Sequence, residues 1–161
     1  MRFVFRFFVI MAGIVGFLSQ VTAQRIYKSN SVLTSGQWYK ISVKEAGIYK
    51  IDISFLTNLG INATNLSSSS IRLYGNAGRM LSESNNGLWS DDLIENAIFV
   101  ADGGDGILNG SDYILFYAPG SDKWIKDTIN HRFSYQKNLY SDSAYYFITI
   151  GGTGKRITIS Q

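Results

Sequence analysis

Short runs of alternating apolar and polar residues, each closed by a turn signal, dominate the sequence from residue 38 onward. Residues 38–43 (WYKISV) alternate and are followed by Glu45-Ala46-Gly47, after which residues 48–53 (IYKIDI) alternate again. Successive side chains of a strand point to opposite faces, so a period of two predicts strands that are buried on one face. The short glycine-containing connection between these two runs predicts a β-hairpin.

Further strand-like runs follow at the spacing typical of all-β domains. They are residues 71–74, 94–100, 113–117, 123–126, 132–135, 145–150 and 155–159. Many short strands at such intervals indicate an antiparallel β-sandwich or a barrel-like domain. The sequence has a single proline, Pro119, so its turns depend on Gly, Asn and Asp. We therefore predict a mainly β fold, organised as a single β-rich domain over residues 24–161.

One short helix is predicted near residues 54–60, among the strands. Ser54 is the candidate N-cap, Gly60 the candidate C′ residue, and Ile61 the hydrophobic contact beyond the helix. Residues 62–70 are polar and include four consecutive serines. We expect that segment to form a loop.

The first 23 residues have the pattern of a secretory signal peptide. Arg2 and Arg6 supply a positive region, residues 7–18 form an apolar helix-forming run, and Val21-Thr22-Ala23 places small residues at a cleavage site. The apolar run is shorter than the roughly 20 residues that span a membrane, so we expect cleavage after Ala23 rather than an anchor. No cysteine follows the run, which excludes a lipoprotein anchor. We predict secretion across the inner membrane.

The distribution of charge argues against a nucleic-acid partner. The formal net charge falls from +3 to +1 when Arg2 and Arg6 leave with the signal peptide. Nine of the twelve acidic residues lie between Glu83 and Asp127, whereas a nucleic-acid-binding domain normally has a dense basic stripe with interleaved aromatic residues. The pattern therefore predicts a protein that does not bind nucleic acid.

The clearest candidate for a ligand site is residues 101–120 (ADGGDGILNGSDYILFYAPG). Three carboxylates and one side-chain amide lie there among five glycines: Asp102, Asp105, Asn109 and Asp112. A calcium loop of EF-hand type needs oxygen ligands at its third and fifth positions and an acid at its twelfth. Counted from Asp102, these positions hold Gly104, Gly106 and Tyr113. The four side chains could still converge in an irregular loop, so they remain the candidate metal ligands.

A turn is the favoured interpretation of this segment. Asp-Gly and Asn-Gly sequences supply the positive φ of tight turns, and Asp112 can accept backbone hydrogen bonds where the next strand begins. Phosphate-binding glycine loops lie between a strand and a helix N-terminus. Here the glycines lead into a strand, with no lysine before Lys123, so we reject a phosphate site.

The sequence offers no catalytic residue. It has no cysteine, and its single histidine, His131, lacks a G-x-S-x-G partner motif and rules out a His-based zinc site. Asp91-Asp92 with Glu95 could act as paired carboxylates, but consecutive acids before a strand are typical of a solvated turn. Tyr145 and Phe147 alternate as on one strand face, so we expect them in the core rather than on a sugar-binding surface. We predict neither a catalytic site nor a cofactor.

An ordered series of short blocks resembles the type IX secretion system sortases, which are gingipain-like cysteine peptidases of Bacteroidetes. The blocks are WYKI (38–41) with GIYKI (47–51), IRLYGN (71–76) with Gly78 and Met80-Leu81, DDLIENA (91–97), DG (105–106) with Gly110 and DYILFY (112–117), Trp124, YSD (140–142) and YYF (145–147). The similarity extends over residues 31–157 in the same order.

The resemblance implies a non-catalytic role for this chain. In that family the corresponding region resembles the gingipain propeptide, a β-rich module, and precedes the peptidase domain. The chain would then be the N-terminal domain of a cell-surface cysteine endopeptidase that cleaves the sorting signal of exported cargo and attaches the cargo to the surface. Its expected partners are its own downstream peptidase domain and other type IX secretion components at the outer membrane. The catalytic cysteine and histidine would lie beyond Gln161.

Two further expectations concern the extent of the chain and an alternative function. The sequence stops at residues 159–161, directly after a strand-like run, which we interpret as a truncation before the peptidase domain. A stand-alone surface module that binds carbohydrate or calcium is the alternative function.

Overall fold

The computed structural model describes residues 27–78, 80–83, 87 and 89–158. The predicted signal peptide, residues 1–23, lies outside the described residues. In the part of the chain that is described, no helix has both the length and the apolar character needed to cross a membrane. The described chain is mainly β, with antiparallel strands and one α-helix, as the sequence predicts.

Strands account for most of the regular structure. The elements are the 3₁₀ turn η1 (Val32–Thr34), β1 (Tyr39–Val43), β2 (Gly47–Asp52), α2 (Ile53–Asn58), β3 (Leu66–Ser67), the 3₁₀ turn η2 (Ser68–Ser70), β4 (Ile71–Tyr74), β5 (Glu95–Asn96), β6 (Phe99–Ala101), β7 (Ile107–Leu108), β8 (Tyr113–Ala118), β9 (Lys123–Asp127), β10 (Arg132–Gln136) and β11 (Ala144–Ile150).

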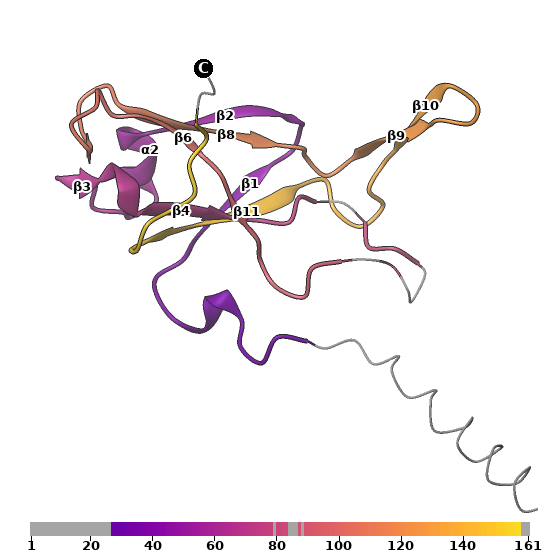
Figure 1. Ribbon diagram of the computed structural model, residues 1–161, viewed down its shortest axis with the longest axis horizontal. Helices are drawn as coiled ribbons and strands as arrows, with labels where there is room; N and C mark the ends of the chain where they lie inside the picture. Colours follow the sequence, from indigo (N-terminus) through magenta and orange to yellow (C-terminus); the bar gives the residue numbers. More distant parts are fainter. Residues whose placement is uncertain (1–26, 79, 84–86, 88, 159–161) are drawn as a thin grey trace, which may run out of the picture.

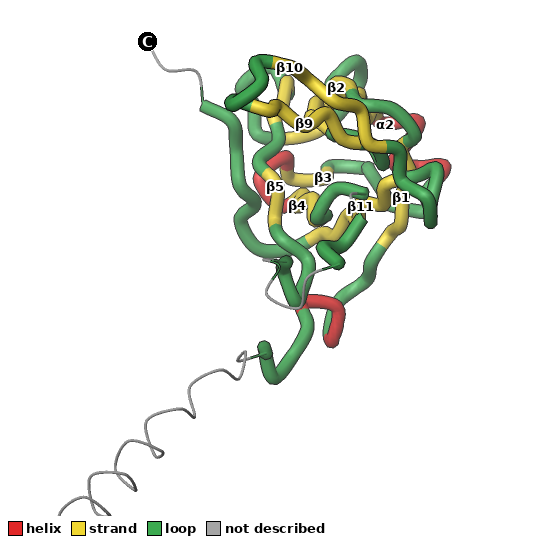
Figure 2. The backbone as a smooth tube through the Cα atoms, turned by 90° about the vertical axis from the view of Figure 1, so that its right-hand side faces the viewer, coloured by secondary structure: helices red, strands yellow, loops and turns green. Residues whose placement is uncertain are grey.

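Two larger antiparallel sheets form the body of the described chain. The first sheet has the strand order β1-β11-β4-β5, and the second has the order β2-β8-β6. They lie one above the other as two layers (Figure 1). The strands β3 and β7 form a small pair, and β9 and β10 form a hairpin that projects from the layers (Figure 1). The segment that carries η1 lies on the far side of the first sheet (Figure 2).

Side-chain alternation explains how the two sheets enclose a common core. In β11, Ala144, Tyr146 and Ile148 are buried and point between the layers, and in β8 Ile114 and Phe116 do the same from the other side. The rings of Phe116 and Tyr146 meet with their centroids 5.3 Å apart. Because these residues come from different sheets, the contact joins the layers into a sandwich.

The predicted hairpin between residues 38–43 and 48–53 is wrong. The strand β1 pairs with β11, and β2 pairs with β8, so the turn at residues 44–46 carries the chain from one sheet to the other. The alternation of the two runs correctly identifies their buried faces, but it contains no information about their partners. Tyr49 fixes this crossover by donating its hydroxyl hydrogen to the carbonyl of Glu45, at 2.8 Å.

The predicted strand over residues 94–100 is divided in two. The strand β5 pairs with β4 in the first sheet, whereas β6 pairs with β8 in the second. Ile98, between them, is buried and forms a parallel bridge with Arg156. The sequence predicts a strand at residues 155–159. Within the described residues of that range, the bridge at Arg156 takes the place of a strand. The predicted loop 62–70 contains β3 and η2.

The helix begins earlier than predicted but ends as predicted. Its N-cap is Asp52 rather than Ser54: the Asp52 carboxylate accepts the Phe55 N–H at 2.9 Å and the Ser54 hydroxyl at 2.7 Å. A carboxylate two residues earlier is therefore the acceptor for the free N–H groups of the first turn.

A Schellman motif closes the helix at its other end. Gly60 has φ of +87°, its N–H bonds to the Thr57 carbonyl at 2.9 Å, and the Ile61 N–H bonds to the Leu56 carbonyl at 3.0 Å. The predicted C′ glycine and the predicted contact of Ile61, which is buried, are both confirmed.

Tyr145 and Phe147 lie on the outer face of the first sheet, not in the core as predicted. Tyr146 is the buried residue, whereas Tyr145 is 43% exposed and lies under the Lys40 ammonium, 3.7 Å from its ring centroid. In a run of three aromatic residues both strand faces are apolar, so the pattern could not identify the inward face. A change of one residue in register exchanges the two faces.

Gly75 tests the packing of the core. A Cβ added at this position would collide with the ring of Tyr146. We expect Gly75→Ala to lower the free energy of unfolding by about 1–3 kcal/mol, because overpacking forces a core side chain to move. Thermal and urea unfolding followed by circular dichroism measure the change. Gly47→Ala is the matched control, since the nearest atom to its added Cβ is 3.9 Å away; equal loss in both variants would contradict the packing argument.

Candidate functional site

The predicted carboxylate group Asp91, Asp92 and Glu95 does not form a catalytic pair. Asp92 accepts hydrogen bonds from the Ser31 hydroxyl and the Val32 N–H, both at 2.8 Å. Asp91 accepts the Lys28 N–H at 2.6 Å. These two carboxylates attach the segment that carries η1 to the body of the domain.

Glu95 attaches a different segment. Its carboxylate forms an ion pair with Arg72 at 3.0 Å and accepts the Lys155 N–H at 2.8 Å. It also accepts a hydrogen bond from the Tyr74 hydroxyl at 3.4 Å. Each of the three acids therefore binds to structural partners. None of them is hydrogen-bonded to another of the three, as a catalytic carboxylate pair would be.

The titration behaviour of these acids follows from their partners. Burial would raise the pKa of Asp92, but the hydrogen bonds from Val32 and Ser31 outweigh burial and leave that pKa below its usual value. Burial likewise opposes ionisation of Glu95, but the Arg72 guanidinium and the Lys155 N–H together outweigh burial, so the pKa of Glu95 is also lowered. Both groups are ionised at neutral pH, which is the wrong state for a general acid.

The acidic loop uses its carboxylates within its own turns. Asp102 accepts the Gly104 N–H at 3.0 Å and the Ser68 hydroxyl, and these bonds lower its pKa. Asp105 accepts the Ile107 N–H at 2.9 Å. The loop is thereby joined to η2 and to the start of β7.

The two remaining candidate ligands, Asn109 and Asp112, also form hydrogen bonds within the acidic loop. Asp112 accepts the Asn109 N–H at 2.8 Å, and the Asn109 amide donates to Asp105 at 3.4 Å. Among the described residues, no group of three or more His, Cys, Asp or Glu side chains is arranged to hold a metal ion. The geometry of Asp102, Asp105, Asn109 and Asp112 is that of a series of turns.

His131 lies in the turn between β9 and β10, where it is exposed and has φ of +50°. A left-handed backbone of this kind is expected in a tight turn. His131 is thus a turn residue that precedes β10.

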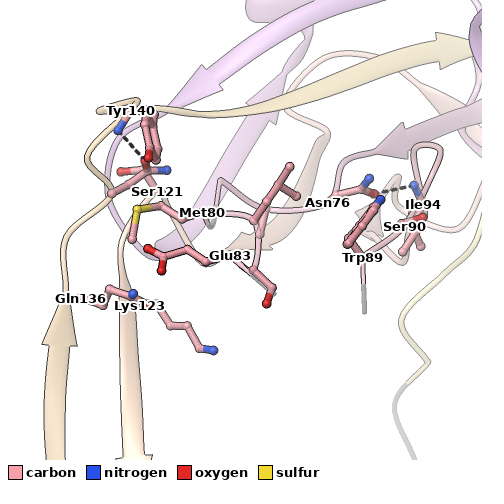
Figure 3. A pocket seen from close by; sticks show the side chains of 14 residues that line it. Asn76, Met80, Glu83, Trp89, Ser90, Ile94, Ser121, Lys123, Gln136 and Tyr140 are labelled. Carbon is pink, nitrogen blue, oxygen red and sulfur yellow. Dashed lines mark hydrogen bonds between the residues drawn. The ribbon is translucent and has the colours of Figure 1, made fainter. Parts of the chain in front are cut away.

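A groove of about 850 Å³ lies between residues 80–83 and 89–90 on one side and the base of the β9–β10 hairpin on the other (Figure 3). Lys123 and Gln136, from β9 and β10, form one wall, and Tyr140 and Met80 lie beside them (Figure 3). The described residues that line it include neither histidine nor cysteine. It therefore lacks the thiol and the imidazole base of a cysteine peptidase.

The amides of this groove maintain its walls. Asn76 accepts the Ile94 N–H at 2.8 Å, a bond drawn in Figure 3, and donates to the Asp92 carbonyl at 2.8 Å. Asn138 accepts the Tyr140 N–H at 2.9 Å and donates to the Gly78 carbonyl. The amide groups of Asn76 and Asn138 therefore join the loops that form the groove.

Exposed aromatic surface is the feature that the sequence analysis missed. On the hairpin, Trp124, Phe133 and Tyr135 are 66%, 66% and 53% exposed. On the outer face of the second sheet, Ile48 and Tyr117 lie opposite each other and are also exposed. The alternation of residues 123–126 and 132–135 predicts the strands correctly, but an exposed strand and a half-buried strand have the same pattern.

Comparison with known proteins relates the fold of this chain to a solved structure. No family model matches the chain, and neither does a curated protein. Among solved structures, the chain is similar to a crystal structure of dimeric latent PorU from Porphyromonas gingivalis, with a TM-score of 0.57 and 25% sequence identity over 81% of this chain. It covers 11% of the PorU chain, so the likeness relates it to one small part of a much larger protein.

The role assigned to Asp92 can be tested by hydrogen exchange. We expect Asp92→Ala to accelerate amide exchange of residues 28–34 by roughly tenfold or more, because the segment loses two hydrogen bonds to a charged acceptor. Asp91→Ala, which removes the hydrogen bond from the Lys28 N–H, is the neighbouring control and should have a smaller effect. Unchanged exchange in Asp92→Ala would contradict the assignment.

The lowered pKa of Asp92 also gives a pH dependence. A depressed folded-state pKa stabilises the attached segment above the unfolded value, roughly 3.9. That stabilisation disappears as the pH falls through the lower folded-state pKa. We expect the wild-type segment to be released in acid, and Asp92→Ala to lack this transition, both followed by the same exchange measurement.

Calcium should not stabilise the domain. Since the carboxylates of residues 102–112 already accept turn hydrogen bonds, we expect the same Tm in about 1 mM calcium as in EDTA. Differential scanning calorimetry measures the shift, with magnesium as the ionic control. A rise in Tm that is specific to calcium and is abolished by Asp105→Asn would show instead that the loop is a calcium site.

Proposed function

We propose that this chain is the non-catalytic N-terminal domain of a secreted cysteine endopeptidase of the type IX sortase class. The observation that carries the proposal is the structural likeness to PorU, with 25% identity over 81% of the chain. It agrees with the ordered sequence blocks from WYKI to YYF, which point to the same secretion system. In this proposal the complete protein cleaves the sorting signal of exported cargo and attaches the cargo at the outer membrane.

The chemistry of the chain is consistent with a supporting role. A cysteine peptidase needs a thiolate nucleophile, and the sequence has no cysteine. Three carboxylates with lowered pKa values, Asp92, Glu95 and Asp102, join segments of the domain to each other. The activity of the parent protein would therefore reside in its peptidase domain, which this domain packs against, orients or restrains.

The described C-terminal segment suits attachment to another domain. The Ile98 N–H donates to the Lys155 carbonyl at 3.2 Å, and the Ile157 N–H donates to the Ile98 carbonyl at 2.9 Å. The Arg156 guanidinium donates to the carbonyls of Ser68 at 2.6 Å and Ile71 at 3.1 Å. A peptidase domain that follows this segment would be joined to a fixed point on the sandwich, which favours a defined orientation.

The proposal predicts that the chain has no peptidase activity by itself. We expect the purified chain to release no more product from a fluorogenic peptide library than a buffer blank does, because it lacks a nucleophile. A heat-denatured sample is the control for contaminating enzyme. Turnover that copurifies with the folded chain would overturn the non-catalytic assignment.

The native protein supplies the positive half of this test. Antibody against the chain should recover, from envelopes of cells that express it, a polypeptide or tight complex much larger than 18.0 kDa that reacts with a thiol-directed peptidase probe. Recovery of the chain alone, without a reactive thiol, would contradict the proposal and favour a stand-alone module.

A further inference from the structure

The β9–β10 hairpin stands apart from both main sheets. Its strands pair only with each other in the described chain, from Arg132 opposite Asp127 to Gln136 opposite Lys123. It projects beyond the two layers (Figure 1). A two-stranded hairpin is marginally stable by itself in water, so its side chains need a further partner to be covered.

One face of the hairpin is aromatic. Trp124 lies opposite Tyr135, and Lys126 lies opposite Phe133. Residues directly opposite in an antiparallel pair, and those two positions along, share a face. The other face carries Lys123 and Gln136, which line the groove of Figure 3. The aromatic face therefore points away from that groove.

The aromatic face is preorganised. The rings of Trp124 and Tyr135 are in contact, with their centroids 5.1 Å apart, and the Tyr135 hydroxyl donates to Asp122. At the tip, Asp127 accepts the N–H groups of Ile129 at 3.1 Å and Asn130 at 3.0 Å. Side chains that are ordered before binding lose little entropy on binding, which favours tight association.

We infer that this face, formed by Trp124, Phe133, Tyr135 and Lys126, is the surface that docks onto the peptidase domain of the same polypeptide. The inference rests on the proposed function and names the surface that performs it. Aromatic residues concentrate in the buried centres of protein interfaces. The match to 11% of the PorU chain leaves most of such a protein to supply the covering surface.

Charge specifies that covering surface further. Lys126 lies among the aromatic rings, and its ammonium would be desolvated when the face is covered. A buried cation needs an opposite charge. The peptidase domain should therefore present an apolar surface with a carboxylate opposite Lys126.

The geometry favours a protein surface over a lipid bilayer. A hairpin that inserts into a bilayer would present several apolar residues at the tip, whereas the turn here carries a single one, Ile129, among the polar residues Thr128, Asn130 and His131. The aromatic rings instead lie along the side of the hairpin, where a broad surface can cover all three at once.

Site-specific photocrosslinking in the native full-length protein tests the inference. The photoreactive residue p-benzoylphenylalanine would replace Trp124 or Phe133, both exposed, with Tyr117→p-benzoylphenylalanine on the outer face of the second sheet as the matched control. We expect positions 124 and 133 to crosslink to the peptidase region of the same polypeptide, and position 117 to give no such product. Mass spectrometry of tryptic peptides identifies the crosslinked partner.

A second measurement uses the unsubstituted protein, so its result does not depend on whether the p-benzoylphenylalanine variants fold. Hydroxyl-radical footprinting of the native protein, with each rate divided by the rate in denaturant, should show Trp124 and Phe133 protected and Tyr117 reactive.

The outcomes separate the inference from the proposed function. Crosslinks from position 117 to the peptidase region without crosslinks from 124 and 133, or reactive Trp124 and Phe133, would overturn the inference alone. Crosslinks from the hairpin to lipid or to another protein would also overturn it. A native polypeptide that carries no peptidase region would overturn the proposed function, and the inference with it.

Discussion

Burial of Tyr146 between the two sheets is the contact on which the rest of the structure depends. Its ring packs on Phe116, which in turn stacks on Tyr49 with centroids 5.7 Å apart. The three rings belong to β11, β8 and β2, so they connect the first sheet to the second through one continuous aromatic row. Burial raises the pKa of Tyr146 to about 12, which keeps the phenol neutral at any physiological pH. Gly75 has no side chain where this ring lies, and this is why the chain can pass so close to it.

The sequence predicted the strands and their buried faces far better than their partners. Alternation in β1 and β2 depends only on which side of each strand meets the core, and this is visible locally. Their pairing with β11 and β8 joins residues about a hundred and about seventy positions apart, and no local pattern encodes such a choice. The same limit explains the division of residues 94–100 into β5 and β6. Two-residue strands such as β3 and β7 are too short to show a period at all.

The candidate sites were predictable to a different degree. The failure of the calcium spacing after Asp102 was evident from the sequence, and the turns that the structure shows there are of the predicted kind. The role of Asp92 was not predictable, because its partners Ser31 and Val32 lie sixty positions away. The DDLIENA block thus joins segments of the fold: Asp92 holds one segment, Glu95 another, and Asn96 donates to the Gly75 carbonyl at 2.9 Å. Such a block can identify a fold without marking a reaction centre.

The surfaces left for recognition are consequently apolar. The acids and amides that could have bound a ligand, such as Asp92, Asp102 and Asn138, already have partners within the chain. These hydrogen bonds join the loops to the sandwich, from which the β9–β10 hairpin projects (Figure 1). The aromatic rings on that hairpin add little to the core, since all lie outside it. Exposed apolar surface of this kind marks a site of interaction with another surface, and this is the physical reason for assigning the proposed docking surface to the hairpin.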